Sequence, residues 1–446
     1  MQDRPSTCEG CQLHDKGIAI GFMSPEGNGS SGVLVVSENL GDHEARESLP
    51  LRPNAPAGSV FQGIIRRIPG LDRTNLSITS TIWCRPGTKN WLDGAPYEYS
   101  AIEHCQQYNR KLVADRRPRA IVSLGGVPTR TITGMAGYNQ GIKLIRGFIL
   151  KASRPEYFVD GNPIPVIASY HPSFLLRASK TRSKDKDSGG TGAKIEKAEG
   201  GMSLSGVVTR DIQLALSIAK NGAPAPHQFQ TIKGDRDVFE NLIRDYEAHP
   251  DWDIAWDIET PRSIDMADDE SEIDSIQAQV TQIQFAHHAD AGFVFPGFSA
   301  EYVRDCTRRL LGLSNRKLSW NGWKFDNKVV SGHHGIPILG IDIDLMSAWH
   351  WVQPDLPKGL QFATSFHAPH LHPWKHLATS DEDTYGACDV ISLILNRDGI
   401  FKVMEAGAEN LLRPACDLAP HGVSSCVPQR VPCGPRASRQ IRRQGQ

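Results

Sequence analysis

The sequence predicts two α/β domains in series: a three-layer α/β/α domain with a parallel sheet, followed by a domain with a mixed sheet. Three observations lead to this prediction. The chain has 446 residues, which is too many for one core at roughly 100–200 residues per domain. In the first half, short β-branched runs alternate with helical stretches, which is the pattern of a parallel sheet. In the second half, strands come first and helices follow, which indicates a mixed sheet covered by helices.

The first domain is expected at residues 1–220, because a segment rich in Pro, Gly and Ala at 221–229 predicts a linker. We expect its strands at 33–37, 76–82, 120–124 and 166–170 and its helices at 60–67, 101–114 and 208–219. Between the last strand and the last helix, residues 177–201 are rich in Lys, Asp, Ser and Gly, which predicts a mobile basic loop.

The second domain is expected at residues 230–411. We expect its helices at 236–248, 301–313, 325–332 and 381–397 and its strands at 254–258, 279–285, 292–295 and 317–320. From residue 412 onward, Pro, Cys and Arg replace the apolar periodicity. Residues 412–446 are therefore expected to form a disordered tail.

The composition is that of a soluble globular protein in the cytoplasm, with 39% hydrophobic and 22% charged residues. No apolar run of about 18 residues could span a membrane, and the start of the chain has no apolar signal sequence. The net charge of −1 means that any affinity for nucleic acid must come from local basic patches or from bound metal. The nine cysteines predict metal ligation or burial rather than disulfides, since the cytosol keeps thiols reduced.

Acidic residues with metal-ligand spacing occur at three places in the second half. Asp257 and Glu259 end an apolar strand, and the period of two places both carboxylates on the same face. Buried like charges require a cation, and Mg²⁺ or Mn²⁺ is the usual one for oxygen ligands. Asp326 follows a later strand, and Tyr385 and Asp389 lie one helical turn apart. Taken singly, Tyr385 also fits a half-buried helix residue and Asp389 a solvated acid.

The ordered set Asp-x-Glu, Asn-x-x-x-Phe-Asp and Tyr-x-x-x-Asp resembles the DEDD exonucleases, in the tyrosine variant of the proofreading domains of family A DNA polymerases. This resemblance implies a ribonuclease H-like fold and 3′→5′ exonuclease activity. It also implies that Asp257, Glu259, Asp326 and Asp389 hold two Mg²⁺ or Mn²⁺ ions, while Tyr385 orients the attacking water. Lys358 and Lys375 stand where such exonucleases could contact phosphates, although a loop lysine is more often only solvated.

Four cysteines have the spacing of a thiolate site: Cys8-x-x-Cys11, then Cys84, then Cys105. Four thiolates suit either a [4Fe–4S] cluster or a structural zinc ion, and the spacing leaves both open. A third interpretation is that two thiols lie near a frayed terminus and two lie in the core.

Polar motifs follow each of the four strands expected in the first half. They are 37–41 (Ser-Glu-Asn-Leu-Gly), 84–86 (Cys-Arg-Pro), 125–126 (Gly-Gly) and 170–173 (Tyr-His-Pro-Ser). In open α/β sheets, ligands bind outside the carboxyl ends of the strands. The set resembles the iron–sulfur uracil-DNA glycosylases of family 4. That resemblance implies that the four cysteines hold a [4Fe–4S] cluster, that Glu38 positions water and that His171 contacts the flipped uracil.

The first half also differs from that family at two positions whose side chains contact the uracil base in the family. Leu51 stands in place of a stacking Phe, and Ser80 lies near the place of an Asn that reads the base edge. A lost stack costs roughly 1–3 kcal/mol per base, and a missing polar reader lowers discrimination. We therefore expect a retained fold with weak or absent uracil excision. The loop at 177–201 is either a duplex wedge or a solvated insertion.

We expect a DNA-processing enzyme of replication or repair that acts on single-stranded 3′ ends and contacts uracil-containing duplex, with a replicative polymerase as a partner and no membrane association. One alternative is a DNA-binding accessory protein without catalysis. Another is a truncated fragment of a family A polymerase fusion, because residues 412–423 faintly resemble the start of a polymerase domain.

Overall fold

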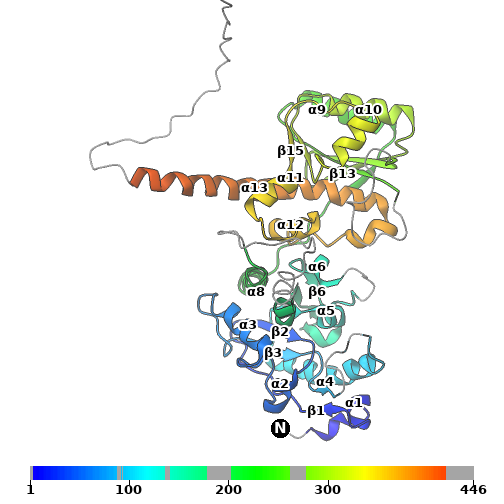
Figure 1. Cartoon of the computed structure of the whole chain (residues 1–446). Coiled ribbons are helices and arrows are strands. Elements are labelled where there is room, and N and C mark those ends of the chain that lie inside the picture. The colour runs from blue at the N-terminus through cyan, green and yellow to red at the C-terminus, as the bar shows by residue number, and fades with distance from the viewer. Residues whose placement is uncertain are drawn as a thin grey trace, which may run out of the picture. The chain divides into compact units, whose positions relative to one another are not determined.

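The computed structural model describes residues 4–87, 92, 94–135, 141–177, 202–261 and 278–417, with side chains as far as residue 406. Residues Met1–Ile400 form one compact unit that contains both sheets, and Phe401–Gln446 form a second unit. The predicted loop at 177–201 lies outside the described residues except for Arg177, and so does the tail beyond residue 417. Figure 1 shows the two sheets and the helices around them.

The first sheet has five strands, of which four are parallel. In spatial order they are β3 (Ser77–Ser80), β2 (Val33–Ser37), β5 (Ala120–Leu124), β9 (Pro165–Ser169) and β6 (Ile149–Lys151). The four parallel strands match the predicted ones closely. The antiparallel edge strand β6 was not predicted, because its three residues form no recognisable apolar run. Every residue of β2, β3 and β5 is buried, as expected for a sheet that is covered on both faces.

The described helices of the first half are α1 (Gln12–Asp15), α2 (Asp42–Glu47), α3 (Pro56–Ile65), α4 (Glu98–Arg116), α5 (Gly126–Thr133), α6 (Gly141–Ile145) and α8 (Leu204–Asn221). Pro56 starts α3, where a proline costs no helical hydrogen bond. Helix α8 packs across β2, β5 and β9 and also contacts α3. The small strands β1 (Ala19–Ile20) and β4 (Arg85–Pro86) pair outside the main sheet.

The second sheet has six strands and is mixed. In spatial order they are β10 (Gln230–Lys233), β13 (Ala291–Pro296), β12 (Gln282–Ala286), β11 (Ile254–Glu259), β14 (Lys317–Ser319) and β15 (Asp342–Asp344). Strand β11 runs antiparallel to β12 and parallel to β14. The two edge strands β10 and β15 were not predicted, because both are short and polar and lack the alternation of a half-buried strand.

The helices of the second half are α9 (Arg236–Ala248), α10 (Glu301–Leu311), α11 (Leu345–Val352), α12 (Leu360–His367) and α13 (Glu382–Asp417). The helix predicted at 325–332 is instead a π-helical turn at Lys328–His333, in which His334 N bonds to Val329 O. Helix α13 continues to Asp417, so the first six residues of the predicted tail, 412–417, are helical. Large aromatic side chains, among them Phe239, Trp256 and Phe285, fill one buried cluster against β11 and β12.

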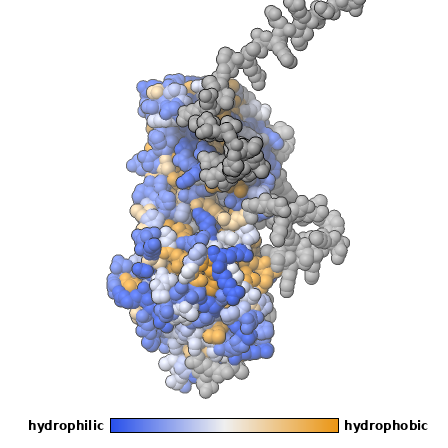
Figure 2. Space-filling view, turned by 90° about the vertical axis from the view of Figure 1, so that its left-hand side faces the viewer, coloured by the Kyte–Doolittle hydropathy of each residue, from blue (hydrophilic) through white to orange (hydrophobic). Residues whose placement is uncertain are grey.

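The surface is mixed in character. Hydrophilic residues predominate on the face shown in Figure 2, with hydrophobic residues scattered among them, which is normal for a folded protein surface. Among the described helices, no helix has the length and apolar character needed to cross a membrane.

Candidate functional site

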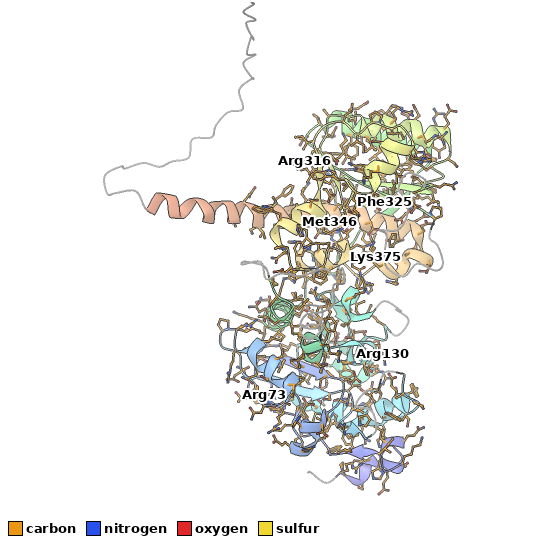
Figure 3. All side chains as sticks on the ribbon, viewed as in Figure 1. Arg73, Arg130, Arg316, Phe325, Met346 and Lys375 are labelled. Carbon is orange, nitrogen blue, oxygen red and sulfur yellow. The ribbon has the colours of Figure 1, made fainter. Side chains whose placement is uncertain are left out.

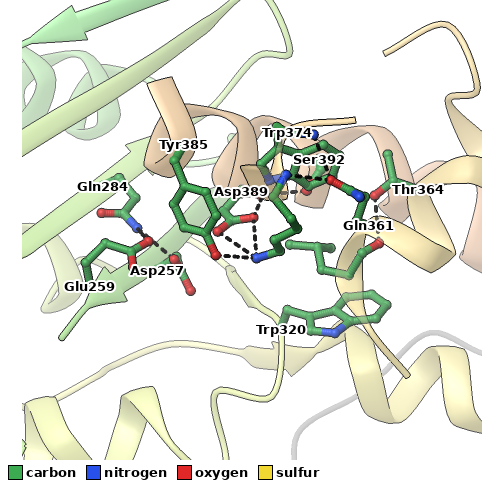
Figure 4. Close-up of polar contacts among 12 residues, drawn as sticks. Asp257, Glu259, Gln284, Trp320, Gln361, Thr364, Trp374, Tyr385, Asp389 and Ser392 are labelled. Carbon is green, nitrogen blue, oxygen red and sulfur yellow. Dashed lines mark hydrogen bonds and ion pairs between the residues drawn. The ribbon is translucent and has the colours of Figure 1, made fainter. Parts of the chain in front are cut away.

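Asp257 and Glu259 lie on the central strand β11 of the second sheet, with one residue between them, so their carboxylates share a face. Glu259 is buried and Asp257 is half-buried. Together with Asp389 they form a group in which one carboxylate oxygen from each residue lies within 4.8 Å of the other two. Figure 4 shows the two strand residues to the lower left of Tyr385 and Asp389 on the other side of its ring. The structure thus joins residues that are 130 positions apart in the sequence.

Two glycines allow α13 to bring Asp389 to the sheet. A Cβ atom on Gly292 of β13 would lie 2.7 Å from the Cα of Ala387. A Cβ on Gly386 would lie 2.7 Å from Nε2 of Gln282 and 3.0 Å from Cδ of Gln284. Real Cβ contacts are longer than this, so α13 could not approach β13 so closely with a larger residue at position 292, and a larger residue at 386 would displace the amides of Gln282 and Gln284. The close approach places Tyr385 and Asp389, both buried, over the end of β11.

Asp326, the fourth predicted acid, is buried beside this group but does not belong to the 4.8 Å set found among the described residues. Its position follows from the turn that begins at Asn321, whose φ of 66° is left-handed. The carboxylate of Asp344 accepts hydrogen bonds from the backbone N–H groups of Asn321 and Trp323, at 3.2 and 3.3 Å. This carboxylate holds the turn in place and so fixes the start of the segment that carries Asp326.

The four acids interact electrostatically. The pKa of Asp257 is raised well above its usual value, first by loss of hydration and then by the charges of Asp326, Asp389 and Glu259. Crowded carboxylates of this kind are stable only if they are protonated or if a cation neutralises them. An all-oxygen set of carboxylates is what Mg²⁺ and Mn²⁺ prefer. The residues present therefore fit one or more hard divalent cations.

Lys375 also lies at this site, and Figure 3 labels it in the second half of the chain. Its ammonium group donates hydrogen bonds to the hydroxyl of Tyr385 and, at 3.2 Å, to both carboxylate oxygens of Asp389. It also lies 4.5 Å from the centroid of the Tyr385 ring. The ammonium of Lys358, in contrast, donates to the backbone carbonyls of Gln353 and Pro354, so this residue braces its own loop.

Three further residues at the site were not found from the sequence. Gln284, on β12 opposite Asp257, donates from Nε2 to Asp257 at 2.7 Å and to Glu259 at 3.2 Å. Trp374 donates from its indole N–H to Asp389 at 2.7 Å. Gln361 accepts from the backbone N–H groups of Trp374 and Lys375. A glutamine or a tryptophan next to an acid is too common for its sequence alone to signal such a contact.

The four predicted cysteines of the first half lie together. Cys8, Cys11, Cys84 and Cys105 are all buried in one cluster. The pKa of Cys84 is raised to about 12, first by burial and then by Cys11 and Cys8, and the pKa of Cys105 is raised by burial and by the other three. The interpretation that two of them lie near a frayed terminus is therefore wrong.

Four buried thiols in one cluster are a donor set that suits either a structural zinc ion or an iron–sulfur cluster, since four thiolates can hold each of them.

Glu38 and His171 follow β2 and β9, at the carboxyl edge of the first sheet. One carboxylate oxygen of Glu38 accepts a hydrogen bond from Leu92 N at 2.9 Å. His171 bonds through Nδ1 to Ser173 Oγ at 2.8 Å. Burial, with a smaller effect of Arg177, lowers the pKa of His171 to about 4, so its imidazole is neutral at neutral pH. Both predicted residues are on the expected edge.

Ser80 and Leu51, the two predicted departures, both point into the protein. Ser80 is fully buried, and its hydroxyl lies 2.7 Å from that of Ser37. Leu51 is buried with a left-handed φ of 47°. Arg73 holds this segment by donating to the carbonyls of Pro50 and Leu51. Neither side chain is exposed at the surface.

Two aromatic residues near this edge are also held in the core. Phe61 is fully buried beneath the guanidinium of Arg73, which lies 5.9 Å from its ring centroid. Trp83 stacks on Tyr108 with ring centroids 5.1 Å apart and donates its indole N–H to Asn109. Neither ring can therefore replace a missing stacking residue without unpacking the core.

Residues 24–188 match the model of the uracil DNA glycosylase superfamily. The type-4 uracil-DNA glycosylase of Sulfurisphaera tokodaii is 27% identical over 176 residues, which cover 39% of this chain and 76% of that relative. The corresponding enzyme of Saccharolobus solfataricus is 26% identical over 177 residues, or 40% of this chain and 76% of that relative. The solved structure of the EXO domain of Aedes aegypti Nibbler is similar over 41% of this chain and 94% of that structure, with 15% sequence identity and a TM-score of 0.30. The predicted resemblance of the first half is confirmed.

Proposed function

We propose that this chain, whose residues 24–188 match the uracil DNA glycosylase superfamily, is a DNA-processing enzyme that carries a metal-dependent 3′→5′ exonuclease in its second half. One observation carries the proposal: the carboxylates of Asp257, Glu259 and Asp389 converge to within 4.8 Å, with Asp326 close enough to raise the pKa of Asp257. Acidic residues crowd together at this cost where a divalent cation is to be bound.

In the proposed mechanism, Asp257, Glu259, Asp326 and Asp389 hold two Mg²⁺ or Mn²⁺ ions. Such ions, when bound, supply an activated water and stabilise the attacking and leaving oxygens of a phosphodiester. The hydroxyl of Tyr385 orients that water. Lys375, which contacts Tyr385 and Asp389, keeps both side chains in place and adds positive charge beside the phosphate. The preference for 3′ ends and for DNA follows from the resemblance to proofreading exonucleases.

For the first half we propose a [4Fe–4S] cluster held by Cys8, Cys11, Cys84 and Cys105, with Glu38 and His171 at the base-binding edge. The burial of the four thiols in one cluster supports a shared thiolate site, and the resemblance to the iron–sulfur uracil-DNA glycosylases favours the cluster over zinc. We propose weak or absent uracil excision, because Leu51 stands in place of a stacking Phe and the short side chain of Ser80 has its hydroxyl bonded to that of Ser37. These departures favour a second candidate function for this half: recognition of DNA without excision.

We place the protein in DNA replication or repair in the cytoplasm, with a replicative polymerase as a candidate partner. The test of the exonuclease uses the full chain and single-stranded DNA labelled at either end. With Mg²⁺, a 5′ label should remain on a ladder of shortening products, while a 3′ label should appear at once as mononucleotide. Release of mononucleotide from the 5′ end would reverse the proposed polarity. No release with either label in Mg²⁺ or Mn²⁺ would overturn the function.

A further inference from the structure

Gln361 of α12 is buried and is bonded at both ends of its carboxamide. Its oxygen accepts hydrogen bonds from the backbone N–H of Trp374, at 2.7 Å, and of Lys375, at 2.8 Å. These two residues are the ones whose side chains donate to Asp389. One glutamine therefore fixes the backbone that carries both donors to an acid of the proposed metal site.

The nitrogen of the same carboxamide donates to the carbonyl of Leu144, which belongs to α6 in the first half of the chain. The residues that follow also contact the second half. Ile149 N donates to Pro369 O at 2.7 Å. The buried ring of Phe148 meets the indole of Trp374 edge-on, with centroids 6.4 Å apart. The segment 144–149 thus touches both Gln361 and Trp374.

Arg146 anchors this segment. Its guanidinium forms an ion pair with Asp211 of α8, in which both side chains are fully buried, and donates to the hydroxyl of Ser365 at 3.1 Å. The guanidinium also lies 4.8 Å from the ring centroid of Phe362 on α12. Breaking such a pair would leave a buried charge uncompensated, so the arrangement has little freedom to shift.

We propose that Gln361 is a positioning residue through which segment 144–149 of the first half holds Trp374 and Lys375 against Asp389. A hydrogen-bonded path runs from Leu144 O through Gln361 and the backbone N–H of Trp374 to the indole N–H on Asp389. The glycosylase-like half is then a structural part of the exonuclease site, whether or not it excises a base. The inference rests on the proposed exonuclease function.

Two substitutions at Gln361 separate the two ends of the path. Gln361→Glu keeps oxygen acceptors for Trp374 and Lys375 but cannot donate to Leu144 O. Gln361→Leu removes the hydrogen bond to Leu144 O as well as those from Trp374 and Lys375, and the leucine side chain has a similar volume. We expect the Mn²⁺ dissociation constant of the full chain, measured by electron paramagnetic resonance, to rise about tenfold in Gln361→Leu and by a smaller factor in Gln361→Glu. We expect kcat on single-stranded DNA to fall in the same order, with KM for DNA nearly unchanged.

The matched control is Gln213→Glu, which makes the same change on the exposed face of α8 and should alter nothing. Wild-type Mn²⁺ affinity and kcat in both Gln361 variants would overturn the proposal. If the Gln361 variants unfold, Phe148→Leu tests the same brace, since it removes the ring that contacts Trp374; unchanged Mn²⁺ affinity there would also overturn it. A wild-type chain that binds Mn²⁺ but releases no nucleotide would contradict the proposed function and leave the binding comparison valid.

Discussion

At the scale of single residues, Gln284 is the neutral partner of the two carboxylates on β11. Its amide nitrogen donates to both Asp257 and Glu259, so it orients their oxygens before any metal arrives. Hydrogen bonds to charged groups are worth about 1.5–3 kcal/mol. Gln284→Leu should therefore raise the Mg²⁺ concentration for half-maximal exonuclease activity by about tenfold or more.

The control for that prediction is Gln282→Leu. Gln282 lies on the same strand two residues away but donates to the backbone carbonyl of Glu382 rather than to a carboxylate. The two titrations with Mg²⁺ are compared at a fixed DNA concentration. If both variants need the same Mg²⁺ concentration for half-maximal activity, Gln284 does not orient the carboxylates for metal binding.

Cys84 tests the proposed cluster. The full chain purified without oxygen should be brown and show broad visible absorption, because thiolate-to-iron charge transfer accompanies a [4Fe–4S] cluster. Cys84→Ser should bleach this absorption and lower the thermal stability of the first half. Cys306→Ser, which changes a buried cysteine of the second half, should leave the colour unchanged. A colourless wild-type protein with one zinc per chain would contradict the assignment.

Single residues also mark the limit of prediction from sequence. The acids, Tyr385 and the cysteines were predicted because each has a spacing that matches a ligand or a strand end. Gln284, Gln361 and Trp374 were missed because their roles depend on pairing across strands or on contacts between distant segments. Ser80 was identified by position, but its burial against Ser37 depends on the register of β2 and β3.

At the scale of elements, the approach of α13 to the second sheet decides whether the acids meet. Gly386→Ala adds a Cβ that would lie 2.7 Å from Gln282 and 3.0 Å from Gln284. Alanine normally stabilises a helix by up to about 1 kcal/mol relative to glycine. Here we expect a net loss of about 1–3 kcal/mol in unfolding free energy, because the added methyl overpacks the site and displaces the hydrogen-bonded amides of Gln282 and Gln284.

Gly63→Ala is the matched control for that prediction, since Gly63 lies on the exposed side of α3 with nothing within 4 Å of its Cβ position. Chemical unfolding should give the opposite sign for the two variants: stabilised for Gly63→Ala and destabilised for Gly386→Ala. Gly386→Ala should also lose exonuclease activity. A stabilised and fully active Gly386→Ala variant would show that the contact between α13 and β12 is loose.

The elements that were predicted correctly are those with apolar runs or clear helical periodicity. Strands β2 and β5 and helix α9 have the predicted bounds. The elements that were missed are short edge strands such as β6, β10 and β15, which are defined by pairing with a neighbour and carry no pattern of their own. The π-helical turn at Lys328–His333 has the apolar pattern of an α-helix, and the sequence does not distinguish the two.

At the scale of the whole molecule, the two halves differ in how many of the functional residues expected from the resemblances are present and suitably placed. In the second half, three of the four acids converge, Asp326 is close enough to raise the pKa of Asp257, and Tyr385 and Lys375 lie beside Asp389. The first half has Glu38 and His171 on the expected edge, but Leu51 and Ser80 are turned inward. A glycosylase recovers the free-energy cost of flipping a base by stacking the base on an aromatic ring and by hydrogen bonding to its edge. Leu51 has no ring for stacking, and the hydroxyl of Ser80 is bonded to that of Ser37.

We therefore predict little or no uracil excision. Abasic-site formation on a uracil-containing oligonucleotide is measured in the Asp257→Ala background, so that the exonuclease does not degrade the substrate. The rate should be orders of magnitude below that of an active glycosylase, since lost stacking alone costs about tenfold per 1.4 kcal/mol. Efficient excision that disappears in Asp257→Ala/His171→Ala would show that the base pocket works and that this interpretation is wrong.

The central claim is that the acids of the second half form a metal-dependent exonuclease site, and one comparison tests it most directly. Nucleotide release from 3′-labelled single-stranded DNA is measured for the wild type, for Asp257→Ala and for Asp305→Ala, which changes an exposed acid of α10. We expect release in the wild type and in Asp305→Ala only with Mg²⁺ or Mn²⁺, and at least a thousandfold less in Asp257→Ala, at about 1.4 kcal/mol per factor of ten. Release that persists in Asp257→Ala or in excess chelator would contradict the account.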